Sequence, residues 1–213
     1  ATDGANSMVK TTSGHNPVVT YSPDKDAKKQ IDVLVANTEA FNYDAYVSQK
    51  IPIDFSHATT AIKFAVGNDL SRNRKVTKIE IRNVIGSGTY DIASKTWTSG
   101  TDKKNFELTL TDPFSTAVNS DVIMNGGDGI FFMVPQDIPT DAEVEISFDH
   151  GKSAKAKIGS KGQKWVAGTT RTYAISNPKD EDGKKFELKV ESSKYTYSYD
   201  ETSVPFAVTS YSQ

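Results

Sequence analysis

Three histidines are the residues of this chain best suited to acid–base or metal chemistry. His15, His57 and His150 could each act as a general base or bind a metal through a ring nitrogen. None is paired two or four residues along the chain with another ligand-type residue in a metal-binding arrangement. We interpret His57, beside strand-forming residues, as a structural histidine with a satisfied hydrogen bond rather than a catalytic base. His150 stands in a turn and is expected to be solvated.

Motifs for nucleophilic catalysis and nucleotide binding are missing from the sequence. The chain has no cysteine, which excludes a thiolate nucleophile, a thiolate zinc site and a disulfide. It contains neither a Gly-x-Ser-x-Gly elbow nor a P-loop lysine. Gly86 and Gly88 form a lone Gly-x-Gly, which we predict to be a turn because no helix pattern follows it. We therefore expect a protein without catalytic residues and without a cofactor.

An acidic cluster at residues 180–183 has the composition of the start of a calcium loop. The EF-hand spacing requires an acid where Pro178 stands and a bidentate glutamate where Lys189 stands. Both requirements fail, so we predict a turn and no metal ion. No pair of carboxylates has a spacing that suggests glycoside hydrolysis, although a folded sandwich could bring distant acids together.

Aromatic side chains are the remaining candidates for ligand contact. Trp97 and Trp165 each follow a lysine-containing turn, and a flat tryptophan at the surface can stack on a sugar ring. A tryptophan at a strand end more often fills the end of a sandwich core, and we favour that interpretation. Tyr195, Tyr197 and Tyr199 occupy one face of a predicted strand and either pack on a neighbouring sheet or form an exposed stripe. These five residues are the candidate glycan-stacking positions.

The elements that must position these residues are mostly strands, because apolar residues recur at every second position. The run at 130–134 is continuously apolar, which is typical of a central strand buried on both faces. Residues 22–30 predict one short helix with Ser22 as its N-cap, followed by a strand-like run at 31–36. Gly, Asn and Asp clusters between the runs predict tight turns. The predicted strands are residues 51–55, 61–66, 76–84, 106–110, 130–134, 144–148, 173–175, 186–190 and 195–199.

Composition narrows the class of protein further. The chain has 213 residues with a formal net charge of −2, which argues against an electrostatic nucleic-acid binder. No stretch approaches the roughly 18 consecutive apolar residues of a membrane-spanning helix. The sequence starts at Ala1 without a signal segment, so we expect a mature or trimmed form. Frequent turns between many short strands predict an all-β, antiparallel β-sandwich.

Four blocks, in order, resemble the fimbrillin (Mfa-like) family of Bacteroidales. Residues 51–64 are similar to its strand with an apolar–x–Phe–x–His–Ala pattern, and residues 79–90, followed by Trp97, are similar to its next block. Residues 131–136 resemble its aliphatic–Pro–Gln segment, and residues 164–175 resemble its closing Trp–x–x–Gly–x–x–Tyr strand. Each block is weak alone, whereas the ordered set is fairly specific.

The resemblance implies transthyretin-like or immunoglobulin-like β-sandwich domains in an exported surface lipoprotein, fimbrial subunit or adhesin. Family members carry a lipidated cysteine, which this chain lacks, so we expect any anchor to lie upstream of Ala1. Residues 1–50 would be a remnant or extension of an N-terminal domain, and 51–177 a fimbrillin-like sandwich. Residues 178–213 would be a linker followed by strands that resemble the start of a BACON-type domain.

These expectations lead to two functional hypotheses. The first is a non-enzymatic adhesin or fimbrial subunit at the cell surface, whose partners are other pilus subunits or a host surface protein. It would act by strand exchange, with the donor strand near residues 18–21 or 186–208. The alternative is a carbohydrate-binding surface module that stacks sugars on exposed aromatic side chains. An enzyme is the least favoured hypothesis.

Overall fold

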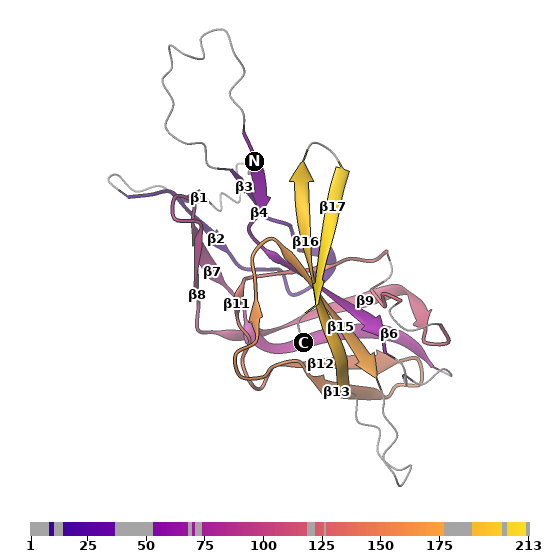
Figure 1. Ribbon diagram of the computed structural model, residues 1–213. Helices are drawn as coiled ribbons and strands as arrows, with labels where there is room; N and C mark the ends of the chain where they lie inside the picture. The colour runs from indigo at the N-terminus through magenta and orange to yellow at the C-terminus, as the bar shows by residue number, and fades with distance from the viewer. Residues whose placement is uncertain are drawn as a thin grey trace.

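The protein folds as an all-β structure, as predicted. The computed structural model of the 213-residue chain describes residues 9–10, 15–36, 53–67, 70, 74–118, 122–125, 127–176, 189–201 and 204–211. Two main sheets pack face to face, and smaller sheets lie at their margin (Figure 1). In the described part, no helix has the length and apolar character needed to cross a membrane.

The first main sheet is antiparallel and has the strand order β13-β12-β6-β9. Its strands are β6 (Lys75–Ile85), β9 (Lys103–Ser115), β12 (Glu143–Phe148) and β13 (Ser153–Lys157). In β12, buried residues alternate with half-buried ones along the whole strand. This alternation turns one face of the sheet toward the core and leaves the other for charged side chains.

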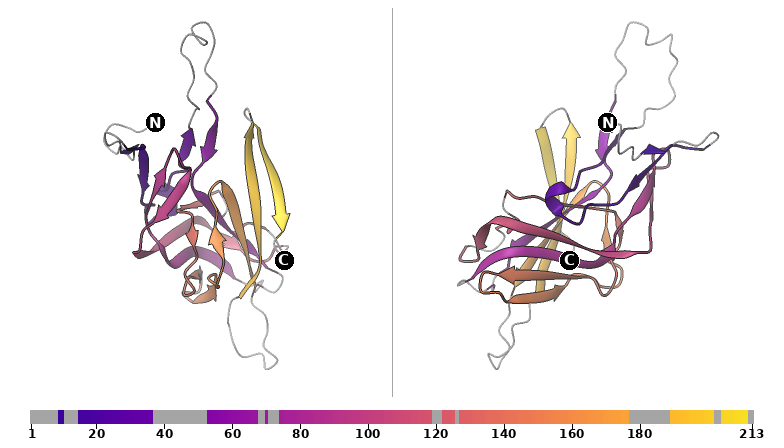
Figure 2. Two further views of the ribbon diagram at one scale, coloured as in Figure 1. Left: turned by 60° about the vertical axis from the view of Figure 1, so that its left-hand side comes forward. Right: turned by 180° about the vertical axis from the view of Figure 1, so that it is seen from behind.

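The second main sheet has the order β10-β5-β15-β16-β17. Strands β5 and β15 pair in parallel, and the other pairs are antiparallel. The strands are β5 (Thr60–Val66), β10 (Phe131–Met133), β15 (Thr169–Ser176), β16 (Lys189–Glu201) and β17 (Val204–Tyr211). The C-terminal strands therefore extend the main sheet, and their hairpin reaches past the sandwich on the side where β3 and β4 lie (Figure 2).

The core between the two main sheets is aromatic at its centre. The Phe64 ring stacks on the Tyr173 ring with centroids 5.8 Å apart, and it meets the Phe131 ring edge-on at 6.1 Å. These rings pack with aliphatic side chains of the facing sheet, such as Ile79 and Leu108, none of which is exposed. Edge-to-face and offset ring pairs are the arrangements that aromatic quadrupoles favour.

Two small sheets pack beside the sandwich around a second core. One has the order β1-β2-β7-β8, and the other pairs β3 with β4. Buried Val19, Tyr21, Tyr90 and Val134 belong to this second core. The strands are β1 (Val9–Lys10), β2 (Val18–Tyr21), β3 (Leu34–Ala36), β4 (Phe55–His57), β7 (Gly88–Asp91) and β8 (Thr96–Ser99). Since β2 pairs with β7 and β3 with β4, strand pairing crosses the boundary predicted between residues 50 and 51.

Two local predictions were wrong. Residues 130–134 do not form a central strand, because β10 lies at the edge of its sheet and pairs only with β5 in the described part. Side chains replace the missing strand: the Gln30 Oε1 atom accepts from Phe132 N at 2.8 Å, and the Tyr21 hydroxyl donates to Phe132 O at 3.1 Å. The predicted helix is one 3-10 turn, η1 (Ala27–Lys29), whose N-cap is Asp26 rather than Ser22.

Candidate functional site

The register of the β3–β4 sheet gathers polar side chains at its base. Leu34 pairs with His57, and the ladder continues because Ala58 N donates to Val33 O at 2.8 Å. One step further, this register places Asp32 opposite Thr59. Because side chains alternate along a strand, His57 and Thr59 share one face.

Asp32 is the centre of the resulting hydrogen-bond cluster. Its Oδ2 atom lies 2.5 Å from His57 Nδ1, and its Oδ1 atom accepts from the Thr59 hydroxyl at 2.6 Å. Thr59 is 2% exposed, while Asp32 and His57 are half-buried. The hydrogen bond expected for His57 is thus present. Among the residues that the structure describes, no group of three or more His, Asp or Glu side chains could hold a metal ion.

A cleft of about 240 Å³ opens beside this cluster, and we call it the Asp32 cleft. Gly168 lies at its margin with φ +70, a conformation that favours glycine, and an added Cβ atom would stand 3.3 Å from His57 O. The glycine therefore lets the turn before β15 approach β4 closely. The cleft is lined by Asp32, His57, Thr59, Ala61, Lys63, Ile130, Phe132, Gly168, Thr169 and Thr170.

A second cleft, of about 300 Å³, involves other residues of the same small sheet. We call it the Phe55 cleft. Tyr90 and Ile92 of the neighbouring β7 region add to its apolar lining, and Lys95 follows in the turn to β8. The lining residues are Val35, Ala36, Asp54, Phe55, Ser56, Tyr90, Ile92 and Lys95.

Large apolar side chains at the β3–β4 sheet are exposed to solvent. Ile31, Leu34, Ile53 and Phe55 retain between 47% and 55% of their accessible surface. Scattered exposed apolar residues are ordinary, whereas a group on one small element marks a candidate interaction surface. We call these four residues the apolar group.

The two tryptophans occupy different environments. Trp165 is 2% exposed, and its indole N–H donates to the Tyr173 hydroxyl at 2.9 Å. The core interpretation is therefore confirmed for Trp165, and its ring presents no face for a sugar. Trp97 is half-buried, its indole N–H donates to Ala58 O at 2.7 Å, and its ring packs 5.3 Å from the Tyr90 ring.

The three tyrosines of the predicted stripe lie on β16. The backbones of two of them are paired on both sides, since Tyr195 lies between Arg171 and Ser210 and Tyr197 between Thr169 and Val208. Tyr199 pairs with Phe206 of β17 and has no partner on β15 in the described part. The side chains of Tyr195, Tyr197 and Tyr199 lie outside the described part of the structure. Their role in glycan stacking stays a prediction.

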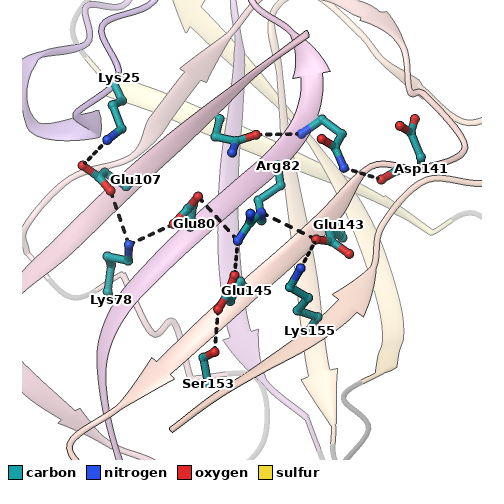
Figure 3. Close-up of polar contacts among 12 residues, drawn as sticks. Lys25, Lys78, Glu80, Arg82, Glu107, Asp141, Glu143, Glu145, Ser153 and Lys155 are labelled. Carbon is teal, nitrogen blue, oxygen red and sulfur yellow. Dashed lines mark hydrogen bonds and ion pairs between the residues drawn. The ribbon is translucent and has the colours of Figure 1, made fainter. Parts of the chain in front are cut away.

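The outward face of the first main sheet carries a row of glutamates. Glu145, Glu80 and Glu107 stand directly opposite one another on β12, β6 and β9. Like charges in such positions repel, and basic side chains between them offset the repulsion (Figure 3). The Lys78 Nζ atom lies 2.9 Å from Glu80 and 3.3 Å from Glu107, and the Arg82 guanidinium contacts Glu145.

Further ion pairs complete this charged face. Arg82 Nε lies 3.6 Å from Glu143, and Lys155 Nζ lies 2.7 Å from the same carboxylate. The hydrogen bond from Lys25 lowers the pKa of Glu107. We call the eight charged residues the charged face: Lys25, Lys78, Glu80, Arg82, Glu107, Glu143, Glu145 and Lys155.

Sequence reasoning missed Asp32 as a site residue. It is the one charged residue in the apolar run at 31–36, and an isolated acid in a predicted strand is a usable signal because burying a charge needs a partner. Its partners, His57 and Thr59, lie about 25 residues later in the chain. Strand register decides which residues come to lie beside Asp32. Of the predicted residues, the cluster contains only His57, while exposed His150 pairs with Asp149 at 2.5 Å.

Comparison with known proteins gives a family and a fold. A family model described as fimbrillin-like matches residues 5–193. A candidate cell adhesion protein from Bacteroides uniformis aligns with 18% identity and a TM-score of 0.58, over 87% of this chain and 68% of that one. A second candidate cell adhesion protein, from Bacteroides ovatus, aligns with 16% identity and a TM-score of 0.58, over 91% of this chain and 64% of that one. A fimbrial protein from Bacteroides vulgatus aligns with 14% identity and a TM-score of 0.58, over 90% of this chain and 72% of that one. No curated protein sequence matches.

Proposed function

Because the chain belongs to the fimbrillin-like family, we propose that it is a cell-surface adhesin or fimbrial subunit that acts through protein–protein contacts. The family match over residues 5–193 is the observation that carries the proposal. The names of the structural relatives, two candidate cell adhesion proteins and one fimbrial protein, point the same way. In this proposal the protein is exported and held at the cell surface, by a lipid anchor upstream of Ala1 or within a fimbrium.

The second main sheet supports strand exchange as the mode of assembly. Strand β17 lies at the edge of this sheet and pairs only with β16 in the described part. Its backbone hydrogen-bonding groups on the other side could pair with a neighbouring chain, or β17 could leave and add to a neighbour's sheet. Strand β2, the other predicted donor, lies between β1 and β7, so both of its edges are already used. We therefore assign the donor role to residues 204–211.

A proline in β17 tests this assignment. Val208 pairs with Tyr197, and Val208→Pro removes a backbone donor from a strand at the edge of its sheet, where proline is best tolerated. We expect loss of multimers, measured by size-exclusion chromatography with light scattering, and loss of bacterial adhesion. Val208→Thr, which keeps the backbone donor, is the matched control and should assemble normally. Unchanged assembly of the proline variant, with an unchanged melting temperature, would rule out β17 as the donor.

A further inference from the structure

We propose that the Asp32 cleft binds one neutral sugar unit. The cleft combines a fixed carboxylate, an ammonium group, a hydroxyl and an aromatic ring within about 240 Å³. This is the chemistry that matches the alternating hydroxyl and C–H groups of a pyranose. The inference does not depend on strand exchange, because none of these groups belongs to β16 or β17.

The hydrogen-bond acceptor of the cleft, the Asp32 carboxylate, is held in place by its own hydrogen bonds. Thr59 is 98% buried, and its hydroxyl hydrogen is committed to Asp32 at 2.6 Å, while His57 holds the other carboxylate oxygen at 2.5 Å. An ionised carboxylate can accept about four hydrogen bonds. Two of these positions are used by residues that the structure describes, so lone pairs remain for ligand hydroxyls. A carboxylate held in place loses little conformational entropy when it binds.

The other wall supplies hydrogen-bond donors. Lys63 on β5 is half-buried and forms no ion pair within the described ranges, so its ammonium group is available to ligand oxygens. The Thr170 hydroxyl on β15 lies in the same cleft, since Ala61 pairs with Thr170 and Lys63 with Thr172. Donors on one wall and an acceptor on the other allow a single ring to be oriented.

Phe132 supplies the apolar surface and helps to exclude another class of ligand. Its ring lines the cleft and is half-buried, which suits contact with the C–H face of a sugar. Its backbone N–H and C=O are already bonded to the side chains of Gln30 and Tyr21. A peptide that adds to a sheet edge needs those two groups. The size of the cleft, below the ~300 Å³ lower bound of drug-sized ligand pockets, favours one ring over an oligosaccharide.

Titration with simple glycosides tests the proposal. We would record ¹⁵N-resolved NMR spectra of the full chain with the methyl glycosides of glucose, galactose, mannose, fucose and N-acetylglucosamine. The expected result is binding of at least one glycoside with a Kd near 1 mM, as an order of magnitude, and shifts of the Lys63, Phe132 and Thr170 amides. No shift at these amides with any glycoside up to about 20 mM would overturn the proposal.

Two variants and a matched control locate the binding. Asp32→Asn and Lys63→Met should each weaken binding about tenfold, the effect of one charge-assisted hydrogen bond. Asp54→Asn, in the Phe55 cleft, should leave the Kd unchanged. Lys63→Met removes no hydrogen bond or ion pair among the described residues and keeps an unbranched side chain, so the melting temperature should be unchanged and a lost signal cannot be ascribed to unfolding.

Other outcomes of these titrations would overturn either the location of the site or the class of ligand. Binding that survives both variants, or that moves with Asp54→Asn, would overturn the Asp32 cleft as the site. Binding of N-acetylneuraminic acid alone, lost in Lys63→Met and kept in Asp32→Asn, would make the cleft an anion site and overturn the neutral sugar. Assembly by light scattering is read on the same variants, so a failed sugar proposal leaves the proposed adhesin or fimbrial function standing.

Discussion

The charged face and the β3–β4 sheet expose different kinds of side chain to water. On the charged face, each acid has a basic partner within the network (Figure 3), and the inward-facing side chains of the same sheet belong to the main core. At the β3–β4 sheet, the apolar group stays exposed beside two clefts. A surface whose charges satisfy one another has little to offer a partner, whereas exposed apolar area gains free energy when it is covered. We therefore expect contacts with other molecules at the β3–β4 sheet and stability from the charged face.

The largest predicted effect is on the charged face. Arg82→Met removes the positive charge shared by three glutamates, Glu80, Glu143 and Glu145. We expect a loss of about 1–3 kcal/mol in the free energy of unfolding, because the half-buried carboxylates are left to repel one another. Urea denaturation measures it. Lys103→Met, in an exposed pair with Asp141, is the control and should cost less than about 0.5 kcal/mol.

A smaller effect is expected at the base of the β3–β4 sheet. Thr59→Val keeps the shape of a buried side chain and removes the hydrogen bond to Asp32. We expect a loss of about 1–2 kcal/mol, since the carboxylate loses one of its two donors. Thermal unfolding followed by circular dichroism measures it. A cost larger than that of Arg82→Met would contradict the ranking of the two regions.

Acid should weaken the charged face before other features. The hydrogen bond from Ser153 and the charge of Arg82 lower the pKa of Glu145, and Lys25 lowers that of Glu107. A lowered folded-state pKa means that the unfolded chain binds more protons, so this stability is present above the ordinary pKa of glutamate. It is lost as the pH falls from that value through the folded-state pKa. The slope of unfolding free energy against pH in this acidic range should be shallower in Glu145→Gln.

A second acid-sensitive contact gives an independent reading. The Thr111 side chain and backbone, with Lys28, lower the pKa of Asp128 from 3.8 to about 2. As for Glu145, the folded-state pKa is lowered, so the stability that Asp128 contributes is present above pH 3.8 and is lost as the pH falls toward 2. Asp128→Asn should therefore reduce the slope of unfolding free energy against pH in this range. Equal slopes in both variants and the unmodified protein would contradict these assignments.

The smallest effect on stability is expected in the apolar group. Phe55→Ser and Leu34→Ser replace exposed side chains and should change the unfolding free energy by less than about 0.5 kcal/mol. Adhesion to the partner surface should nevertheless fall in both variants, as measured by a bead or cell attachment assay. Lys155→Ser on the charged face is the comparison and should adhere normally. Equal adhesion by all three variants would remove the β3–β4 sheet as the contact surface.

Local patterns predicted the strands of the two main sheets except β13 and β17, and they missed most of the short strands. The alternation in residues 144–148 matches β12, and that in 76–84 falls within β6. This works because every second side chain of an antiparallel strand points to the buried face. The apolar run at 130–134 failed as a signal of a central strand. Its edge position is hidden from local inspection because distant side chains, Gln30 and Tyr21, satisfy the backbone of Phe132.

The candidate site was less predictable than the fold. His57 was identified with its correct environment, yet its partner Asp32 depends on the β3–β4 register, which local patterning leaves open. The core interpretation was favoured for Trp165, but the sequence alone does not decide it, because a lone aromatic residue between Lys164 and Val166 also fits a ligand site. Its partner, Tyr173, lies on another strand, so the decisive contact is tertiary.

The parallel pairing of β5 with β15 has a consequence for how the chain folds. Ala61 pairs with Thr170, about a hundred residues later, and the register continues to Val66 and Ile175. Strands β15, β16 and β17 can pair with one another locally, but they join β5 and β10 only after this long loop has closed. As the chain is synthesised, β5 must therefore wait with one edge open until nearly the whole sandwich has emerged. Pairing of β5 with β15 should therefore limit the rate of folding. Until then, the open edge of β5 is where a chaperone would bind.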